Sequence, residues 1–101
     1  MSNHSTIRRA VIRGRVQGIG YRVWAEREAL SRSLEGWVRN RRDGAVEAVF
    51  AGPADAVDAM IEVCRRGPAL AHVEGIDVQE ASAADLGQRR QGEKFSLLPT
   101  T

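Results

Sequence analysis

The rest of the chain is organised around the stretch Gly14-Arg15-Val16-Gln17-Gly18-Ile19-Gly20-Tyr21-Arg22. This stretch joins a strand-like run to a helix-like run. Gly18 and Gly20 allow the backbone to turn tightly and to take positive φ without steric cost. A turn that leads into a helix leaves several backbone N–H groups without partners, and the helix dipole adds partial positive charge there. The stretch therefore predicts a loop that can bind an anion.

Arg22 strengthens this interpretation. It falls in the first turn of the expected helix, where the dipole disfavours a cation. An arginine is explained there if a phosphate or carboxylate lies between its guanidinium and the loop N–H groups. The alternative is a tight connection with a solvated arginine, and this stretch alone leaves both open. The motif lacks dinucleotide glycine spacing and a following Lys-Ser or Lys-Thr pair, so we expect a small phosphorylated group.

The composition indicates a single domain. A chain of 101 residues has no room for a second core, and a hydrophobic fraction of 43% argues against disorder. Fifteen basic residues against thirteen acidic ones give a net charge of +2, a smaller excess than a nucleic-acid-binding tail carries. We expect residues 1–6 to form a flexible N-terminus and residues 7–98 to form the domain.

The sequence also bears on compartment and partners. Cys64 is the only cysteine, which excludes an intrachain disulfide and fits a reducing cytosol. Arg8 and Arg9 follow a polar start with no apolar signal region, and no stretch approaches the ~20 apolar residues that span a bilayer. We therefore expect a cytoplasmic monomer that contacts neither a membrane nor nucleic acid.

Local patterns predict five strands and two helices. The predicted strands are residues 7–15, 34–39, 45–51, 72–80 and 94–98; one helix covers 21–32, and a second opens at Gly52-Pro53 and ends at Gly67-Pro68. Asp43-Gly44 between two alternating runs indicates a hairpin. The parity of Val73 differs from that of Ile76, which a bulge at Gly75 would reconcile. Residues 81–92 are expected to form a loop.

Both helices have a core-facing stripe. In the second helix the stripe follows helical spacing and consists of Val57, Met60, Ile61 and Cys64. In the first helix the stripe is less regular and consists of Tyr21, Ala25 and Ala29. Pro53 suits the first helical position of the second helix, and Asp55 suits its positive end. We expect Cys64 to be a buried small hydrophobe and not a nucleophile.

The order strand, helix, strand, strand, helix, strand predicts an α+β fold, the ferredoxin-like split β-α-β sandwich: an antiparallel sheet with two helices on one face. A right-handed crossover makes the first two strands parallel, with the third inserted between them. Their carboxyl ends then lie at one edge of the sheet, about 10 Å apart. One end carries the glycine turn and Arg22, and the other carries Asn40.

Asn40 is therefore a candidate site residue. Its side chain offers both an acceptor and donors, and it can hold a water in a fixed direction beside a bound phosphate. The alternative is an asparagine that caps its own backbone at the end of a hairpin. Sequence spacing alone favours the capping role.

Two motifs together resemble those of the acylphosphatases. Residues 14–22 resemble the phosphate loop of that family, and Gly36-Trp37-Val38-Arg39-Asn40 followed by Asp43-Gly44 resembles its second signature. Gly67-Pro68, Ala71, Val73 and Phe95 also match, so the resemblance extends over about residues 7–98. It implies a hydrolase that uses no metal or other cofactor and cleaves a carboxyl–phosphate anhydride to carboxylate and inorganic phosphate.

The resemblance also implies roles for individual residues. Arg22 would hold the substrate phosphate, and Asn40 would position the attacking water. Backbone N–H groups would cradle the phosphate oxygens, and these belong to Val16, Gln17, Gly18, Ile19, Gly20, Tyr21 and Arg22. The chain departs from the family at Arg32, usually aliphatic, and at Ser33, usually glycine. Serine tolerates the left-handed conformation poorly, so we expect an effect on the end of the first helix and not on the chemistry.

The sequence fits two other functions less well. A ferredoxin-like nucleic-acid binder would need aromatic residues on its third strand for base stacking, and residues 45–50 read Ala-Val-Glu-Ala-Val-Phe. A non-catalytic or carbamoyl-phosphate-directed relative, such as the acylphosphatase-like domain of hydrogenase-maturation factors, occurs within much longer chains. His4 and His72 belong to no cluster with metal-ligand spacing, and Trp24 and Trp37 are expected to pack or to line a surface.

Overall fold

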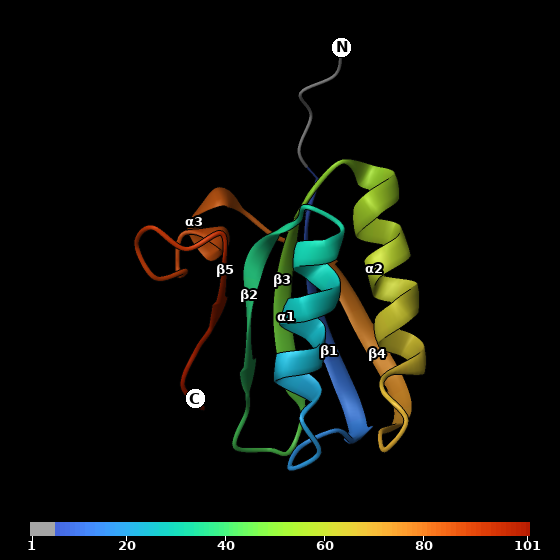
Figure 1. Ribbon diagram of the computed structural model, residues 1–101. Coiled ribbons are helices and arrows are strands. Elements are labelled where there is room, and N and C mark those ends of the chain that lie inside the picture. The colour runs from blue at the N-terminus through green and yellow to red at the C-terminus, as the bar shows by residue number, and fades with distance from the viewer. Residues whose placement is uncertain (1–5) are drawn as a thin grey trace.

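A five-stranded sheet carries two helices on one face, as Figure 1 shows for this computed structural model, which describes residues 6–101. The strands are β1 (Thr6–Arg15), β2 (Glu35–Asn40), β3 (Val46–Gly52), β4 (His72–Glu80) and β5 (Phe95–Leu97), in the spatial order β4-β1-β3-β2-β5. The helices are α1 (Tyr21–Ser31), α2 (Ala54–Arg66) and the short α3 (Ala83–Leu86). The predicted split β-α-β arrangement is confirmed. None of the described helices is long and apolar enough to cross a membrane.

The sheet is antiparallel through its first four strands, as predicted, but its fifth strand is not. β5 runs parallel to β2, with Gly36 opposite Phe95 and Val38 opposite Leu97. The sheet is therefore mixed. A three-residue strand carries no signal of its own direction, because that direction depends on how the preceding segment crosses the sheet.

The bounds of several elements differ by one residue from those predicted. β1 begins at Thr6, which pairs with Gly52, whereas β3 and β5 begin one residue later than expected and α1 ends one residue earlier, at Ser31. Residues 1–5, the rest of the predicted flexible N-terminus, lie outside the described residues, and so does His4. β2 includes Asn40, which pairs with Val46 on β3.

The predicted irregularity in β4 is confirmed next to Gly75. Arg13 lies opposite Gly75, whereas Gly14 lies opposite Val73, so Glu74 is the extra residue of a bulge. Gly14 has a φ of 125°, and a Cβ there would lie 2.2 Å from the His72 carbonyl oxygen. The two strands therefore approach too closely for a side chain at the position where the site loop begins.

The main core lies between the sheet and the two long helices. The predicted stripes of α1 and α2 are both buried, which confirms them. They pack against the inward side chains of the sheet, among them Ala10, Ile12, Val46, Ala48 and Phe50. This packing holds the start of α1 against the end of β1 and so positions the loop between them.

A second, smaller core on the opposite face was missed from sequence. Trp37 and Val49 are fully buried there, and Leu98, Ile7 and Leu86 pack against them. The Trp37 indole N–H donates to the Asp85 carbonyl at 2.7 Å. Part of the cover comes from α3, within residues 81–92, which we predicted to be loop.

That prediction was wrong for a physical reason. In α3 the Ser82 hydroxyl accepts from the Asp85 N–H at 3.2 Å, and the Asp85 carboxylate accepts from the Ser82 N–H at 2.8 Å. This reciprocal capping stabilises a single helical turn, which is too short to show a hydrophobic period. The bonds from Ser82 hold the pKa of Asp85 below its ordinary value, with Arg9 contributing.

The end of α1 adopts the conformation that glycine would favour. Among the described residues, Ser33 is the only non-glycine with positive φ, at 59°. Leu34 N–H donates to the Ala29 carbonyl and Ser33 N–H to the Leu30 carbonyl, both at 3.0 Å, which closes the helix end in a Schellman motif. Ser33 therefore occupies the left-handed position that glycine favours, and the helix end keeps the capping bonds of that motif.

Candidate active site

The loop between β1 and α1 has the conformation that its glycines predict. Gly18 and Gly20 have φ of 77° and 82°, both in the left-handed region. A Cβ at either position would meet nothing within 4 Å, so glycine is required here by conformation and not by crowding. Gly20 is the N-cap of α1, and no side chain within residues 6–101 caps that end. The first turn of the helix has no acidic residue.

A shallow cavity of about 100 Å³ lies at this loop. Its lining consists of Val16, Gly18, Gly20, Tyr21, Arg22, Val23 and Asn40. Arg22 comes from the first turn of α1, and Asn40 is the last residue of β2. The fold thus brings the two candidate side chains to one cavity, at the sheet edge where the topology predicts them.

Arg22 and Asn40 share a second property. Within residues 6–101, neither side chain makes a hydrogen bond or an ion pair, although both residues are half-buried. The alternative in which the Asn40 side chain caps its own backbone is therefore not observed. Both groups can take a ligand without breaking an existing bond, which lowers the cost of binding.

The other predicted phosphate-binding residues are placed in different ways. Val16, Gly18, Gly20 and Tyr21 line the cavity, whereas Gln17 and Ile19 do not. Ile19 packs against the main core. The Gln17 side chain leaves the loop toward the β2–β3 turn, where its Nε2 donates to the carbonyls of Arg41 and Ala45. No local sequence signal indicates this contact, because it joins residues 24 and 28 positions apart.

Tyr21 anchors the start of α1. Its buried hydroxyl donates to the Cys64 carbonyl on α2 at 2.7 Å. Burial raises the pKa of Tyr21 far above its ordinary value, so the phenol is not a proton donor for chemistry at neutral pH. Burial likewise raises the pKa of the Cys64 thiol to about 12, which agrees with the predicted structural role of that residue.

The carboxylate of Asp43 stabilises the turn that follows Asn40. Asp43 accepts from the Ala45 N–H at 3.0 Å and from the Arg41 guanidinium at 2.8 Å. The Ala45 N–H, with the charge of Arg41 contributing, holds the pKa of Asp43 below its ordinary value.

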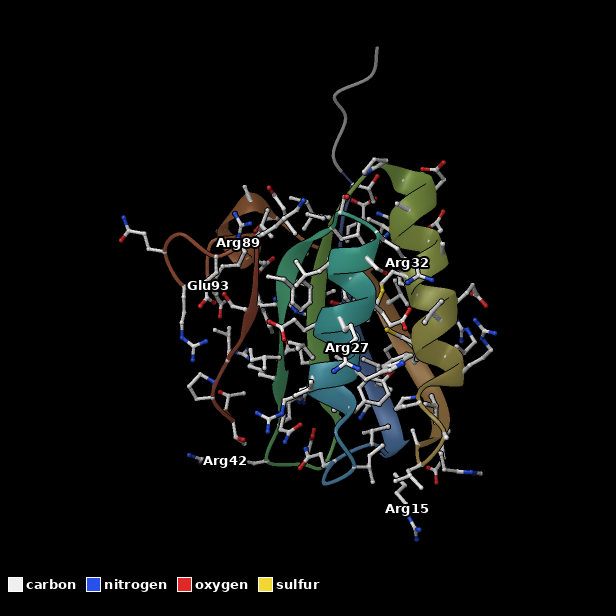
Figure 2. The ribbon with its side chains drawn as sticks, in the orientation of Figure 1. Arg15, Arg27, Arg32, Arg42, Arg89 and Glu93 are labelled. Atoms are coloured by element: carbon white, nitrogen blue, oxygen red, sulfur yellow. The ribbon has the colours of Figure 1, made fainter. Side chains whose placement is uncertain are left out.

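Figure 2 shows two exposed arginines, Arg15 and Arg42, projecting outward from this same edge of the sheet. Their charge adds to a positive field that attracts anions.

A larger groove, of about 500 Å³, lies elsewhere, along β1 and β4. Each arginine that lines it is paired with a carboxylate: Arg9 with Asp85, Arg13 with Asp77 and Arg41 with Asp43, at 2.8–2.9 Å. Arg9 Nε also lies 3.0 Å from Glu47, at an angle that forms an ion pair but no hydrogen bond. Neither Arg22 nor Asn40 lines this groove. No group of three or more potential metal ligands occurs among the described residues.

Comparison with known proteins identifies the family. The family model for acylphosphatase matches residues 8–95. An acylphosphatase from Rhodopseudomonas palustris (strain BisB18) is 56% identical over 94 residues, which cover 93% of this chain and 95% of that protein. The crystal structure of acylphosphatase from Bacillus subtilis aligns with a TM-score of 0.79 at 34% identity, covering 94% of this chain and 99% of that chain. The chain belongs to the acylphosphatase family, and its activity is the hydrolysis of small acyl phosphates.

HypF contains a segment with the same fold. Full-length HypF aligns with a TM-score of 0.83 at 22% identity, but the match covers 99% of this chain and only 13% of that one. At this identity the likeness shows the fold alone. The much higher identity to stand-alone acylphosphatases favours the hydrolase over a domain of that type.

Proposed function

We propose that the hydrolysis takes place at the cavity between the 16–22 loop and β2, with Arg22 and the loop N–H groups holding the phosphate and Asn40 holding the water. One observation carries this proposal. Two polar side chains from distant segments line a single cavity, and within the described residues neither has another partner. Such groups cost stability unless a ligand uses them.

The phosphate half of the site would act through positioning and charge. In a loose transition state the transferred phosphoryl group spreads negative charge over its equatorial oxygens. Backbone N–H groups at the uncapped start of α1 can stabilise that charge without rearrangement. The Arg22 guanidinium adds a charge-assisted, bidentate grip that an ammonium group would not reproduce.

The water half would act through direction. The Asn40 amide accepts a hydrogen bond from the water and aims its oxygen at phosphorus, opposite the leaving group. The new bond joins the water oxygen to phosphorus, the bond from phosphorus to the acyl oxygen breaks, and the carboxylate leaves with the electron pair. A phosphate oxygen of the substrate takes the proton. Because carboxylate is a good leaving group, no strong general acid is required.

We propose that the reaction needs no metal or other cofactor, since phosphate charge is met by Arg22 and backbone dipoles. A monomer suffices, because both halves of the site come from one chain. The cytoplasm is the proposed location, on the basis of the single buried cysteine.

The assay is hydrolysis of benzoyl phosphate, followed spectrophotometrically with and without a chelator. We expect full activity in both, with competitive inhibition by inorganic phosphate. Activity lost with chelator and restored by a divalent cation would contradict the metal-free mechanism.

The two roles are separated by kinetics on two variants. Arg22→Ala should weaken phosphate inhibition as well as kcat, whereas Asn40→Ala should lower kcat and leave the inhibition constant of phosphate nearly unchanged. Thermal melts on both variants control for folding. An Asn40→Ala enzyme with normal kcat would remove the assigned role of the amide.

A further inference from the structure

Gln17 joins the two halves of the site. Its side-chain amide donates two hydrogen bonds, to the Arg41 carbonyl at 2.7 Å and to the Ala45 carbonyl at 2.9 Å. Gln17 belongs to the loop after β1, and Arg41 follows Asn40 directly. β1 and β2 are not neighbours, because β3 lies between them. The glutamine therefore makes a direct side-chain connection between the phosphate loop and the turn that carries Asn40.

The turn that receives these bonds is internally closed. Arg41 N–H donates to the Ala45 carbonyl at 2.8 Å, and Gly44 N–H donates to the Arg41 carbonyl at 3.1 Å. Each of the two carbonyls thus accepts one bond within the turn and one from Gln17. Because these bonds close the turn, we expect a contact at Arg41 to restrain the adjacent Asn40 as well.

We propose that Gln17 is a positioning residue, which sets the placement of Asn40 relative to the bound phosphate. The inference rests on the roles proposed above for Arg22 and Asn40. The side chain suits the task, because one uncharged amide nitrogen supplies two N–H donors to two carbonyls. Asparagine is one methylene shorter, and glutamate presents oxygens to oxygens. A purely structural role would instead leave the kinetics of the folded enzyme unchanged.

The kinetic consequence follows from geometry. The water must lie in line with phosphorus, and a misplacement of about 1 Å can cost on the order of a hundredfold in rate. Without the Gln17 contact the turn can shift against the loop, whereas Arg22 and the loop N–H groups still hold the phosphate. Loss of the contact should therefore lower kcat and spare phosphate affinity.

The first test compares Gln17→Ala with Gln91→Ala, a matched control at an exposed glutamine that makes no side-chain hydrogen bond within residues 6–101. Benzoyl phosphate kinetics and phosphate inhibition are measured on both. We expect Gln17→Ala to lose about ten- to a hundredfold in kcat with a nearly unchanged inhibition constant. The control should match the parent. An unchanged kcat in Gln17→Ala, or phosphate affinity that falls as much as kcat, would overturn the proposal.

The second test is a double-mutant cycle. Because Gln17 acts through Asn40, adding Gln17→Ala to an Asn40→Ala enzyme should lower kcat little further. A loss that adds in full would show that Gln17 acts by another route and would overturn the proposal. A normal kcat in Asn40→Ala alone would instead contradict the proposed function, so the two failures are distinguishable.

Gln17→Glu keeps the shape of the side chain and serves if the alanine variant fails to fold. The ionised carboxylate cannot donate to either carbonyl, but the protonated acid can donate to one. The kcat of Gln17→Glu relative to the parent should therefore rise as the pH falls through the carboxyl pKa. A ratio that stays flat across that range would overturn the positioning role.

Discussion

α1 and α2 cover the same face of the sheet (Figure 1), yet their first turns carry charges of opposite sign. α2 begins after Pro53, carries Asp55 in its first turn and ends with Arg65 and Arg66, so its charges oppose the helix dipole at both ends. α1 begins after a left-handed glycine, has no acidic residue in its first turn and places Arg22 there.

The difference separates stability from function. In α2 the charges at both ends favour the helix, and its buried stripe packs against the sheet, although Pro53 is the N-cap and not the first helical residue as predicted, and makes no side-chain cap. At the start of α1 the charge instead opposes the helix, and that is where the cavity lies. Local conflicts of this kind are expected where a site needs groups that folding alone would not choose. Substitutions at the ends and in the buried stripe of the two helices test this division.

Arg22→Ala should reduce kcat/KM by a factor that corresponds to a loss of about 3–4 kcal/mol or more in transition-state stabilisation. This loss is comparable to that of removing an oxyanion donor. The melting temperature should not fall, because the side chain has no partner within the described residues. Arg22→Lys should not restore activity, since an ammonium group lacks the planar fork. Steady-state kinetics with a thermal melt measure both. A lysine variant with normal kcat/KM would show that charge alone suffices.

Met60→Ala on α2 should lower the stability of the protein and leave its activity unchanged. Met60 is fully buried in the main core, so its truncation should cost about 3 kcal/mol in the free energy of unfolding. Urea unfolding measures that loss, and the kcat of the folded enzyme should stay near that of the parent. A large fall in kcat at full folding would mean that α2 also controls the site.

Ser33→Gly should stabilise the other end of α1. The left-handed conformation costs serine about 1 kcal/mol more than glycine, and glycine gives part of that back through its freer unfolded chain. We expect a gain of about 0.5–1 kcal/mol and unchanged kinetics. Lower stability in urea unfolding would show that serine makes a compensating contact.

Asp55→Asn should give the smallest change. Removing a charge that favours the helix dipole should lower stability by about 0.3–1 kcal/mol, and the effect should shrink in high salt. Activity should not change, because Asp55 does not line the cavity. A loss that is independent of salt would point to a hydrogen bond and not to the dipole.

Much of the fold could be predicted because its signals are local. The glycines at 18 and 20 predict positive φ at those positions, Asp43-Gly44 predicts the turn, and the stripe of α2 follows helical spacing. The approach of Arg22 and Asn40 also followed from sequence, since the order of elements determines which strand ends share an edge.

The rest depends on contacts between distant segments. Trp37 is buried by Leu98 and by α3, which reach it from the end of the chain, so strand alternation alone gave no sign of a second core. The Gln17 side chain likewise donates to two backbone carbonyls. Every residue has a backbone carbonyl, so the sequence does not indicate which ones accept these bonds. The sequence pattern therefore does not indicate that the Gln17 side chain bonds to the β2–β3 turn.

The proposed reaction requires that the start of α1 and the loop before it bind phosphate. A titration with inorganic phosphate, followed by amide chemical shifts and by thermal melts, tests it directly. We expect saturable shifts at Gly18 and Gly20 and a melting temperature that rises with phosphate, because only the folded chain forms the loop. In Arg22→Ala the same titration should require more phosphate. Unchanged shifts at both glycines and an unchanged melting temperature at saturating phosphate would contradict the account.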